Sequence, residues 1–163
     1  MEHEGQGTFY RGGRKLFESI KVDRILHDAD TVNLGGVTLT AHRTAGHTPG
    51  CTSWSLRVMD GATPRDALIL CQLSLPGNPT LVGDANYPDI PADFDASFAL
   101  LKTLPCEVFL SEHGSVFDLE GKRRRMAAGD SNPYVDPAGC KRYLTQAEQD
   151  FRTELAAEQK SAH

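Results

Sequence analysis

The sequence predicts an α/β or α+β domain, because strand patterns come first and strand and helix patterns then alternate along the chain. Three observations carry this prediction. A glycine pair separates two alternating segments, two further apolar strand patterns follow, and helical patterns lie on both sides of the last strand pattern. No internal repeat, low-complexity stretch or domain boundary is visible, so residues 1–163 are predicted to form one domain.

The strand patterns come in a fixed order. Residues 19–26 (SIKVDRIL) have the partial alternation of an extended segment, and residues 27–44 predict a strand, a tight turn and a second strand. Gly35 and Gly36 mark the turn, because glycine accepts the positive φ that such a hairpin requires. Residues 51–58 (CTSWSLRV) predict another strand. Residues 66–73 (DALILCQL) predict one that is suited to burial on both faces.

Two helices are predicted after a proline- and glycine-rich loop over residues 74–91. In residues 92–104, apolar side chains at helical spacing predict an amphipathic helix that Pro105 ends. Residues 106–114 (CEVFLSEHG) then predict a short strand that runs into a histidine-bearing loop. The tail from Lys141 to Lys160 is expected to be helical, with one stripe made of Tyr143, Ala147, Phe151, Leu155 and Glu158.

Composition excludes several classes of function. The chain of 163 residues is 39% hydrophobic and has a formal net charge of −5, so it can bury a core but offers no basic face for nucleic acid. The one basic run, residues 122–125, is interpreted as a solvated loop or helix end. No apolar stretch approaches the ~20 residues of a membrane span. The polar, glycine-rich N-terminus has no apolar core of a signal peptide.

Two of the six histidines are candidate metal ligands. His47 and His113 each end a strand pattern, and each is followed by a glycine or proline turn. Small polar neighbours could hydrogen-bond the second ring nitrogen and so fix the tautomer. A structural or surface role is the alternative at both positions. The remaining histidines carry no such signal, although the acidic stretch after His27 leaves a turn or a cation site open.

The four cysteines form no CxxC pair, which excludes a zinc ribbon. Their spacing leaves open four buried thiols or a set that includes a disulfide. Cys71 lies in a continuous apolar strand pattern and is interpreted as a buried thiol. Cys51 follows Gly50 at the start of a strand pattern and is expected to serve packing.

The stretch TAGHTPGCTSW (44–54) resembles the Thr-x-Gly-His-Thr-x-Gly motif of the metallo-β-lactamases. Residues 21–44 resemble the hairpin before that motif, residues 87–114 the later helix and strand, and residues 132–151 the C-terminal helix. The chain is most similar to the third subclass, from about Lys21 to Gln159. It lacks the His-x-His-x-Asp-His motif of the family. The resemblance therefore implies the C-terminal part of an αβ/βα sandwich.

The resemblance implies zinc-dependent hydrolysis of β-lactam antibiotics by a metal-bound hydroxide. His47 matches a ligand of one zinc ion and His113 a ligand of the second. Ser74 matches a serine that binds the substrate carboxylate, and Gln72 stands where a second serine is often found. The loop from residue 75 to residue 88 is expected to border the cleft. With one matched ligand per metal, the chain alone is expected to bind zinc weakly and to hydrolyse β-lactams slowly or not at all.

Further expectations follow from the same resemblance. The matching positions imply a disulfide between Cys106 and Cys140, and with it a periplasmic or secreted parent enzyme. A thioesterase or lactonase of the superfamily is the alternative enzyme. A non-catalytic folded remnant is the alternative of another class. Loss of the N-terminal part would expose one face of the sheet, so self-association is expected there.

Overall fold

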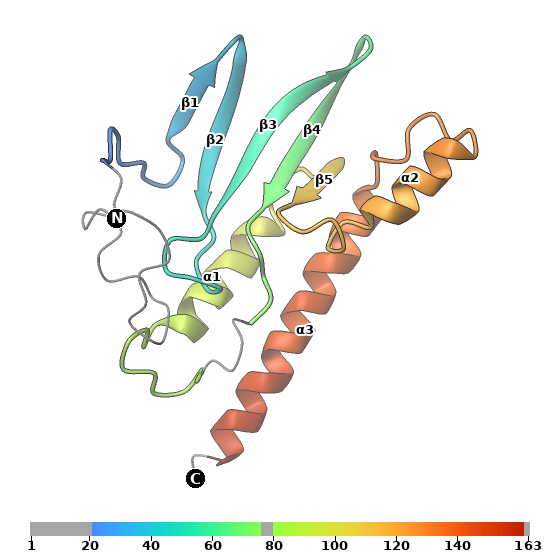
Figure 1. The fold of residues 1–163 in the computed structure, drawn as a ribbon. Helices are drawn as coiled ribbons and strands as arrows, with labels where there is room; N and C mark the ends of the chain where they lie inside the picture. Colours follow the sequence, from blue (N-terminus) through green and yellow to red (C-terminus); the bar gives the residue numbers. More distant parts are fainter. Residues whose placement is uncertain (1–20, 76–79, 162–163) are drawn as a thin grey trace.

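The computed structural model describes residues 21–75 and 80–161, which form one mixed sheet and three helices (Figure 1). The five strands follow one another across the sheet in the order β1-β2-β3-β4-β5. The predicted α/β class is confirmed. The elements are β1 (Thr31–Leu34), β2 (Val37–Arg43), β3 (Thr52–Asp60), β4 (Thr63–Leu70), α1 (Ile90–Leu101), β5 (Val108–Ser111), α2 (Leu119–Ala127) and α3 (Pro137–Ser161).

Strands β1 to β4 form an antiparallel meander. The predicted hairpin is confirmed, because Gly35 and Gly36 join β1 to β2 with φ values of 58° and 83°. The described part of the predicted extended segment, residues 21–26, contains no strand, and residues 19–20 lie outside the described residues. Residues 29 and 30 nevertheless bond to the backbone of Ala41 and so prolong the pairing of β1 with β2.

Strand β5 lies parallel to β4, and α1 is the crossover between them. The buried face of α1 contains Phe94, Phe98 and Leu101, as its pattern predicts. The helix ends at Leu101, before the end of the predicted segment. Leu104 follows in a turn and still packs against the core. The structural end thus comes before Pro105 rather than at it.

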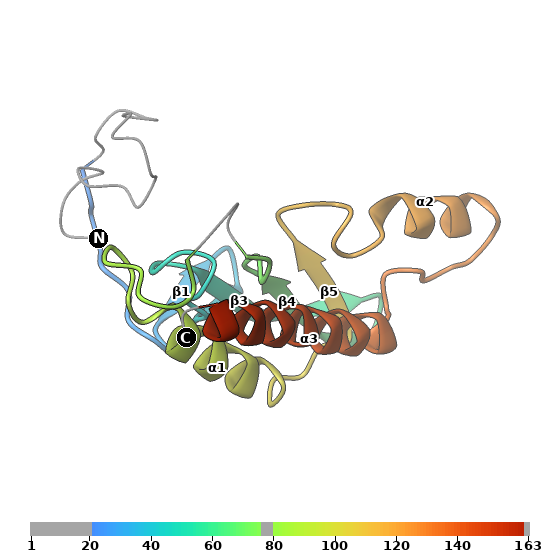
Figure 2. The ribbon, with the colours of Figure 1, turned by 90° about the horizontal axis from the view of Figure 1, so that it is seen from below.

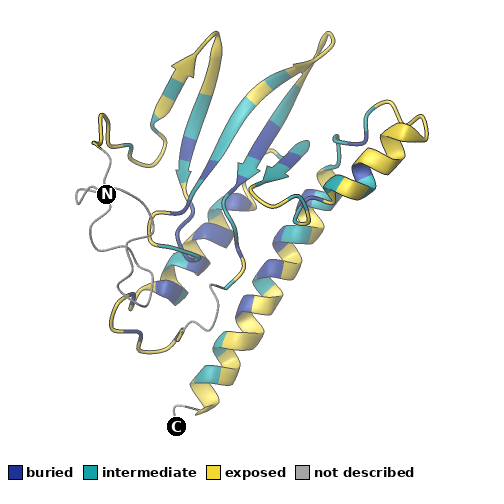
Figure 3. Cartoon of the chain, viewed as in Figure 1, coloured by how far each residue is buried: buried dark blue, intermediate teal, exposed yellow. Residues whose placement is uncertain are grey.

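The C-terminal helix α3 begins at Pro137, earlier than the tail pattern predicts, and runs for 25 residues. It packs beside α1, and the rings of Phe94 and Phe151 lie 4.8 Å apart. Both helices lie on the same side of the sheet (Figure 2). The core therefore lies between one sheet face and this helix layer, and the dark residues of Figure 3 follow it. No helix within residues 21–75 and 80–161 is long and apolar enough to cross a membrane.

Helix α2 contains the basic run, and here the solvated interpretation is wrong for one residue. Arg123 to Arg125 are exposed, but Lys122 is only 1% exposed. Its Nζ lies 5.5 Å from the ring centre of Phe109 and 5.6 Å from that of Phe117. Asp136 is 3.8 Å away, and Nζ has no hydrogen-bond partner within the described residues. Burial lowers the pKa of this ammonium, and the Asp136 carboxylate opposes that shift.

Lys122→Met is expected to keep the fold and to change how stability depends on pH. The lowered pKa means that the unfolded chain binds the proton more tightly than the folded one, so Lys122 makes stability rise with pH up to about 10.5. Urea unfolding between pH 7 and pH 10 should show that the variant lacks this rise. Arg123→Met, at an exposed neighbour, is the control. Identical pH profiles for Lys122→Met and the parent chain would contradict the assignment.

Candidate functional site

Three loops that carry the predicted site residues leave the sheet at the same edge. Strand β2 lies antiparallel to β3, and β3 lies antiparallel to β4, so β2 and β4 point in the same direction. Strand β5 is parallel to β4, and Leu70 and Ser111 are partners near their ends. His47 follows the end of β2, Ser74 the end of β4 and His113 the end of β5. The topology thus gathers the three loops at one edge of the sheet.

The loop of His47 is held against α1 by close packing. Gly46 has a φ of 143°, and a Cβ on it would lie 2.8 Å from ring atoms of Phe94. Ser97 on α1 donates a hydrogen bond of 2.7 Å to the carbonyl of Ala45. The N–H of Thr44 donates to the carbonyl of Cys51 at 2.9 Å, which closes the base of the loop. The sequence Ala-Gly-His is therefore fitted to the surface of α1.

The ring of His47 contacts the loop after β4. Its Nδ1 lies 2.7 Å from the carbonyl oxygen of Ser74. A carbonyl only accepts hydrogen bonds, so Nδ1 is the donor, and in the neutral tautomer Nε2 then has the free lone pair. A backbone carbonyl that fixes the tautomer in this way is typical of metal-ligating histidines. The amide of Gln72 donates to the Ser74 hydroxyl at 2.5 Å, so Gln72 and Ser74 also lie together.

A disulfide joins these two loops. Cys51 is bonded to Cys71, so the interpretation of Cys71 as a buried thiol is wrong, and Cys51 serves more than packing. The two cysteines flank the site, since Cys51 closes the His47 loop and Cys71 comes just before Gln72. The N–H of Cys71 also donates to Ser53 Oγ at 3.0 Å. The bond therefore fixes the distance between the His47 loop and the Gln72 loop.

His113 lies in the exposed loop that follows β5. Its carbonyl accepts a hydrogen bond of 3.0 Å from the N–H of Val116, which begins a tight turn. Behind this loop, Tyr143 on α3 stacks on Phe109 at a centroid distance of 5.4 Å. The N–H of Leu73 donates to the Tyr143 hydroxyl at 3.4 Å. Burial raises the pKa of Tyr143, and the nearby Glu112 carboxylate adds to the rise.

Tyr143 and the Cys51–Cys71 disulfide support the site, and no sequence motif predicts either role. The sequence pattern places Tyr143 only in the apolar stripe of the tail helix. In the structure its ring stacks on Phe109 of β5, and its hydroxyl accepts a hydrogen bond from the loop after β4. Its polar end within an otherwise apolar stripe was the available signal. No comparable signal pointed to the second disulfide, because Cys51 and Cys71 are distant in sequence and lie in unremarkable strand patterns.

The candidate site meets only part of the requirements of a metal. Within residues 21–75 and 80–161, no group of three or more His, Cys, Asp and Glu side chains could hold a metal ion. A catalytic zinc normally takes three protein ligands and water. The His47 tautomer suits a zinc ligand, but the number of donors falls short.

Part of the loop expected to border the cleft, residues 76–79, lies outside the described residues. The stretch after it is tied to α3, because the N–H groups of Leu81 and Val82 donate to Glu158.

Solved structures with the same fold decide the family. The native FEZ-1 metallo-β-lactamase from Legionella gormanii is 40% identical to the chain with a TM-score of 0.84, and the match covers 88% of this chain and 55% of that one. The chain belongs to the metallo-β-lactamase superfamily. BJP-1, a subclass B3 metallo-β-lactamase of Bradyrhizobium japonicum, is 38% identical over 90% of this chain and 55% of its own, with a TM-score of 0.82. No family model matches the sequence.

A more distant β-lactamase has the same extent of overlap. A β-lactamase from Chitinophaga pinensis is 28% identical over 92% of this chain and 57% of its own, with a TM-score of 0.82. The chain thus spans just over half the length of these three β-lactamases. The resemblance to subclass B3 that the motifs carry is confirmed.

Gly46→Ala is expected to destabilise the chain by about 1–3 kcal/mol, as overpacking in a filled core does. The added Cβ would lie 2.8 Å from ring atoms of Phe94, and a φ of 143° is unfavourable for an alanine residue. Urea unfolding measures the loss. Gly50→Ala, in the same loop with nothing within 4 Å of the added carbon, is the matched control. Equal unfolding curves for the Gly46 and Gly50 variants would contradict the packing account.

Proposed function

We propose that this chain contributes the C-terminal half of a zinc-dependent β-lactamase site, with His47 a ligand of one zinc ion and His113 a ligand of a second. Bound zinc supplies a hydroxide near neutral pH, because it lowers the pKa of coordinated water to about 7. The chain's own residues orient the metal ligand and bind substrate. The remaining ligands come from the part of the domain for which the chain has no counterpart, so the chain alone is weakly active or inactive.

The contact between His47 and Ser74 is the observation that carries this proposal. The Ser74 carbonyl accepts from Nδ1 of His47, and the Ser74 hydroxyl accepts from Gln72. One residue thereby holds the candidate ligand with its backbone and offers its exposed side chain to solvent. With Gln72 as the donor, the Ser74 O–H is left to donate to a substrate carboxylate. This arrangement suits a small anionic ring compound such as a β-lactam.

Two other functions remain as alternatives. A thioesterase or lactonase of the superfamily would use the same metal ligands, and the tail and cysteine spacing that resemble subclass B3 favour the β-lactamase over it. A non-catalytic remnant would keep the fold without the activity, and the small number of metal ligands within the described residues favours it for the chain in isolation. These alternatives differ in substrate turnover and in bound zinc.

An oxidising compartment is part of the proposal. Two disulfides, Cys51–Cys71 and Cys106–Cys140, use all four cysteines of the sequence. Cytosolic thiols are kept reduced, whereas periplasmic and secreted proteins keep such bonds. A periplasmic or secreted parent enzyme is therefore proposed. Alkylation of the protein isolated from its native compartment tests this, because alkylation counts free thiols and none is expected.

A chimera tests the function directly. Residues 21–161 of this chain replace the matching part of the Legionella gormanii enzyme, which supplies the rest of the domain. Turnover of a chromogenic cephalosporin with two bound zinc ions per chain is the expected result. Turnover of a thioester or lactone in its place would favour the alternative enzyme. A folded chimera that binds zinc but turns over none of these substrates would overturn the proposal.

Ser74→Ala in this chimera is expected to raise KM for several β-lactams by about 10-fold or more while kcat changes less. A hydrogen bond to a charged group contributes about 1.5–3 kcal/mol, and its loss weakens the binding of substrate and transition state alike. Steady-state kinetics measure both constants. Ser115→Ala, at an exposed serine near His113, is the control. If KM and kcat both stay at parental values, Ser74 has no role in substrate binding.

A further inference from the structure

We propose that Lys122 of α2 is a positioning residue, which holds the loop that carries His113 in a single arrangement. The inference rests on the proposed function, in which His113 is a ligand of the second zinc ion. The name His113 loop is used below for residues 112–118, which join β5 to α2.

The His113 loop folds back onto the first residue of α2. The N–H of Val116 donates to the carbonyl of His113 at 3.0 Å, and the N–H of Leu119 donates to the carbonyl of Gly114 at 2.8 Å. A Cβ on Gly114 would lie 2.9 Å from the Leu119 side chain, so these two residues are in close contact. The position of His113 therefore depends on the position of α2.

Lys122 fixes α2 from its buried side. The rest of the helix is half-buried or exposed, and residues 123–127 are all exposed (Figure 3). The Nζ of Lys122 lies 5.5 Å from the ring centre of Phe109 on β5 and 5.6 Å from that of Phe117 in the His113 loop. Phe109 precedes His113 in the sequence and Phe117 follows it, so one ammonium lies against both flanks of the loop.

Asp136 ties the same ammonium to a third segment. Its Oδ2 lies 3.8 Å from the Nζ of Lys122. Its backbone N–H donates to the carbonyl of Glu107 at 2.9 Å, and its Oδ1 accepts from the N–H of Gly139 at 2.8 Å. The carboxylate is thereby held between the residue before β5 and the first turn of α3. A fixed carboxylate and two ring faces favour one position for the ammonium.

A lysine at this place lowers stability but specifies the arrangement of its neighbours. Burying an ammonium costs free energy that a methionine of similar length avoids. The faces of two aromatic rings attract a cation, and so does a carboxylate, whereas a flexible thioether fills a gap in several orientations. The charge therefore selects one packing of Phe109, Phe117 and α2, and with it one arrangement of the His113 loop.

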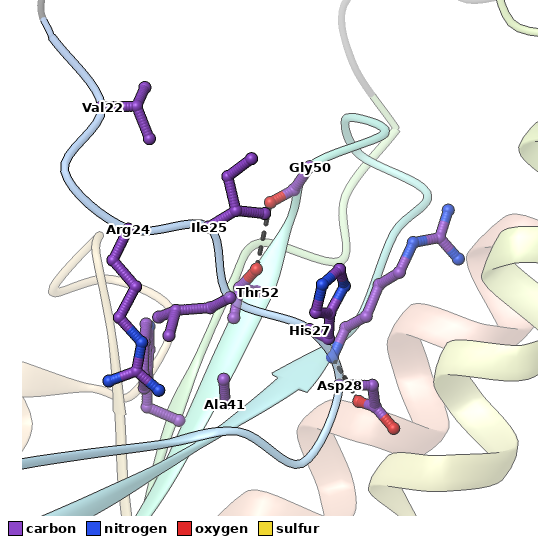
Figure 4. A pocket seen from close by; sticks show the side chains of 11 residues that line it. Val22, Arg24, Ile25, His27, Asp28, Ala41, Gly50 and Thr52 are labelled. Carbon is purple, nitrogen blue, oxygen red and sulfur yellow. Dashed lines mark hydrogen bonds between the residues drawn. The ribbon is translucent and has the colours of Figure 1, made fainter. Parts of the chain in front are cut away.

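The His47 loop has separate supports and serves as an internal reference. The N–H of Thr44 donates to the carbonyl of Cys51, and the disulfide of Cys51 joins the loop to the segment after β4. Gly50 and Thr52 line a cavity of about 420 Å³, and the Thr52 hydroxyl donates to the Gly50 carbonyl at 3.1 Å (Figure 4). The described residues that line this cavity include none from α2. A change in α2 should thus leave the His47 loop as it is.

Amide hydrogen exchange of the full chain, followed by NMR, tests the positioning without any metal. In Lys122→Met, exchange at Val116 and Leu119 should become about 10-fold faster, because the His113 loop opens more often. Exchange at Thr44 in the His47 loop should not change. Arg123→Met, at an exposed neighbour, should leave all three rates at parental values. Equal acceleration at all three amides would indicate a loss of global stability alone and would overturn the proposal, as would parental rates at all three.

Asp136→Asn provides a second variant, in case methionine at position 122 disturbs the packing. Asparagine keeps a side-chain oxygen for the N–H of Gly139 and removes the charge opposite Lys122. The amides of Val116 and Leu119 should again exchange faster, by a smaller factor, since both rings remain. Parental rates at both amides in this variant would also overturn the proposal.

Zinc titration of the chimera separates this proposal from the proposed function. Loss of a residue that supports a metal ligand typically costs 10- to 100-fold in affinity, so Lys122→Met should weaken the binding of one zinc ion by about 10-fold or more. The other ion should keep its parental affinity. Parental affinity for both ions would overturn the role of Lys122 in placing His113. A parent chimera that binds fewer than two zinc ions would count against the proposed function instead, and the exchange rates would still decide whether Lys122 holds the loop.

Discussion

Replacing Cys106 and Cys140 together with serine is expected to lower the free energy of unfolding by about 3–4 kcal/mol. The structure joins these two residues, the pair that the resemblance implies, across 34 residues of sequence. Closing a loop of this length restricts the unfolded chain by about that amount in the chain-entropy model. The bond also ties the segment before β5 to α3, where Cys140 is buried. Urea unfolding of the oxidised parent and the double variant measures the difference.

The other disulfide is the matched control for this experiment. Cys51 and Cys71 are 20 residues apart, so their double serine variant should lose a similar amount of stability by the same model. In the chimera, however, only the Cys51 and Cys71 variant should also weaken zinc binding, because this bond joins the His47 loop to the Gln72 loop. Unfolding curves that do not change when either pair is replaced would contradict the stabilising role.

His47→Ala in the chimera is expected to reduce kcat/KM for a cephalosporin by at least about 100-fold. Loss of a residue that merely supports a zinc ligand typically costs 10- to 100-fold, and loss of the ligand itself should cost more. The isolated chain should bind zinc weakly, because one imidazole per ion cannot replace the water shell of zinc. Zinc titration followed by the cephalosporin assay measures both quantities.

His27→Ala is the control for the metal prediction, since His27 is an exposed histidine whose backbone N–H, rather than its ring, bonds to Asp30. The variant should keep parental zinc content and activity in the chimera. One result would contradict the expectation that the isolated chain binds zinc weakly and is weakly active or inactive. It is tight stoichiometric zinc binding with turnover that His47→Ala or His113→Ala abolishes, because the chain would then hold a complete site.

Local patterns were sufficient to predict most of the fold. The β1–β2 hairpin depends on two adjacent glycines, and α1 depends on apolar residues a few positions apart, so both signals lie within one short segment. Helix α2 shows the limit of this reasoning. Four consecutive basic residues suggest a solvated surface, and only the packing of Phe109 and Phe117 around the helix reveals that Lys122 is buried. The local sequence pattern does not predict which face of α2 packs against those two rings.

The site was predictable where a motif marks it and not where distant segments meet. His47 lies in a glycine-flanked turn that could be recognised directly. Its contact with Ser74 joins residues 27 positions apart and depends on β2 and β4 running in the same direction. The Cys51–Cys71 bond depends on that same arrangement, which is why the sequence supported only a free thiol at Cys71. The contact between His47 and Ser74 and the Cys51–Cys71 disulfide therefore follow from the sheet topology, which local sequence patterns do not predict.

Trp54 gives the sheet face opposite α1 and α3 an optical readout. It is the only tryptophan of the sequence, and it lies half-buried on β3 between its cross-strand partners Ala41 and Ile69. Indole fluorescence shifts to shorter wavelength as water leaves the ring, so the emission spectrum of the whole chain reports the hydration of this one surface. Dilution alone, with no label attached, would therefore let a spectrometer follow whatever leaves or covers that side of the sheet.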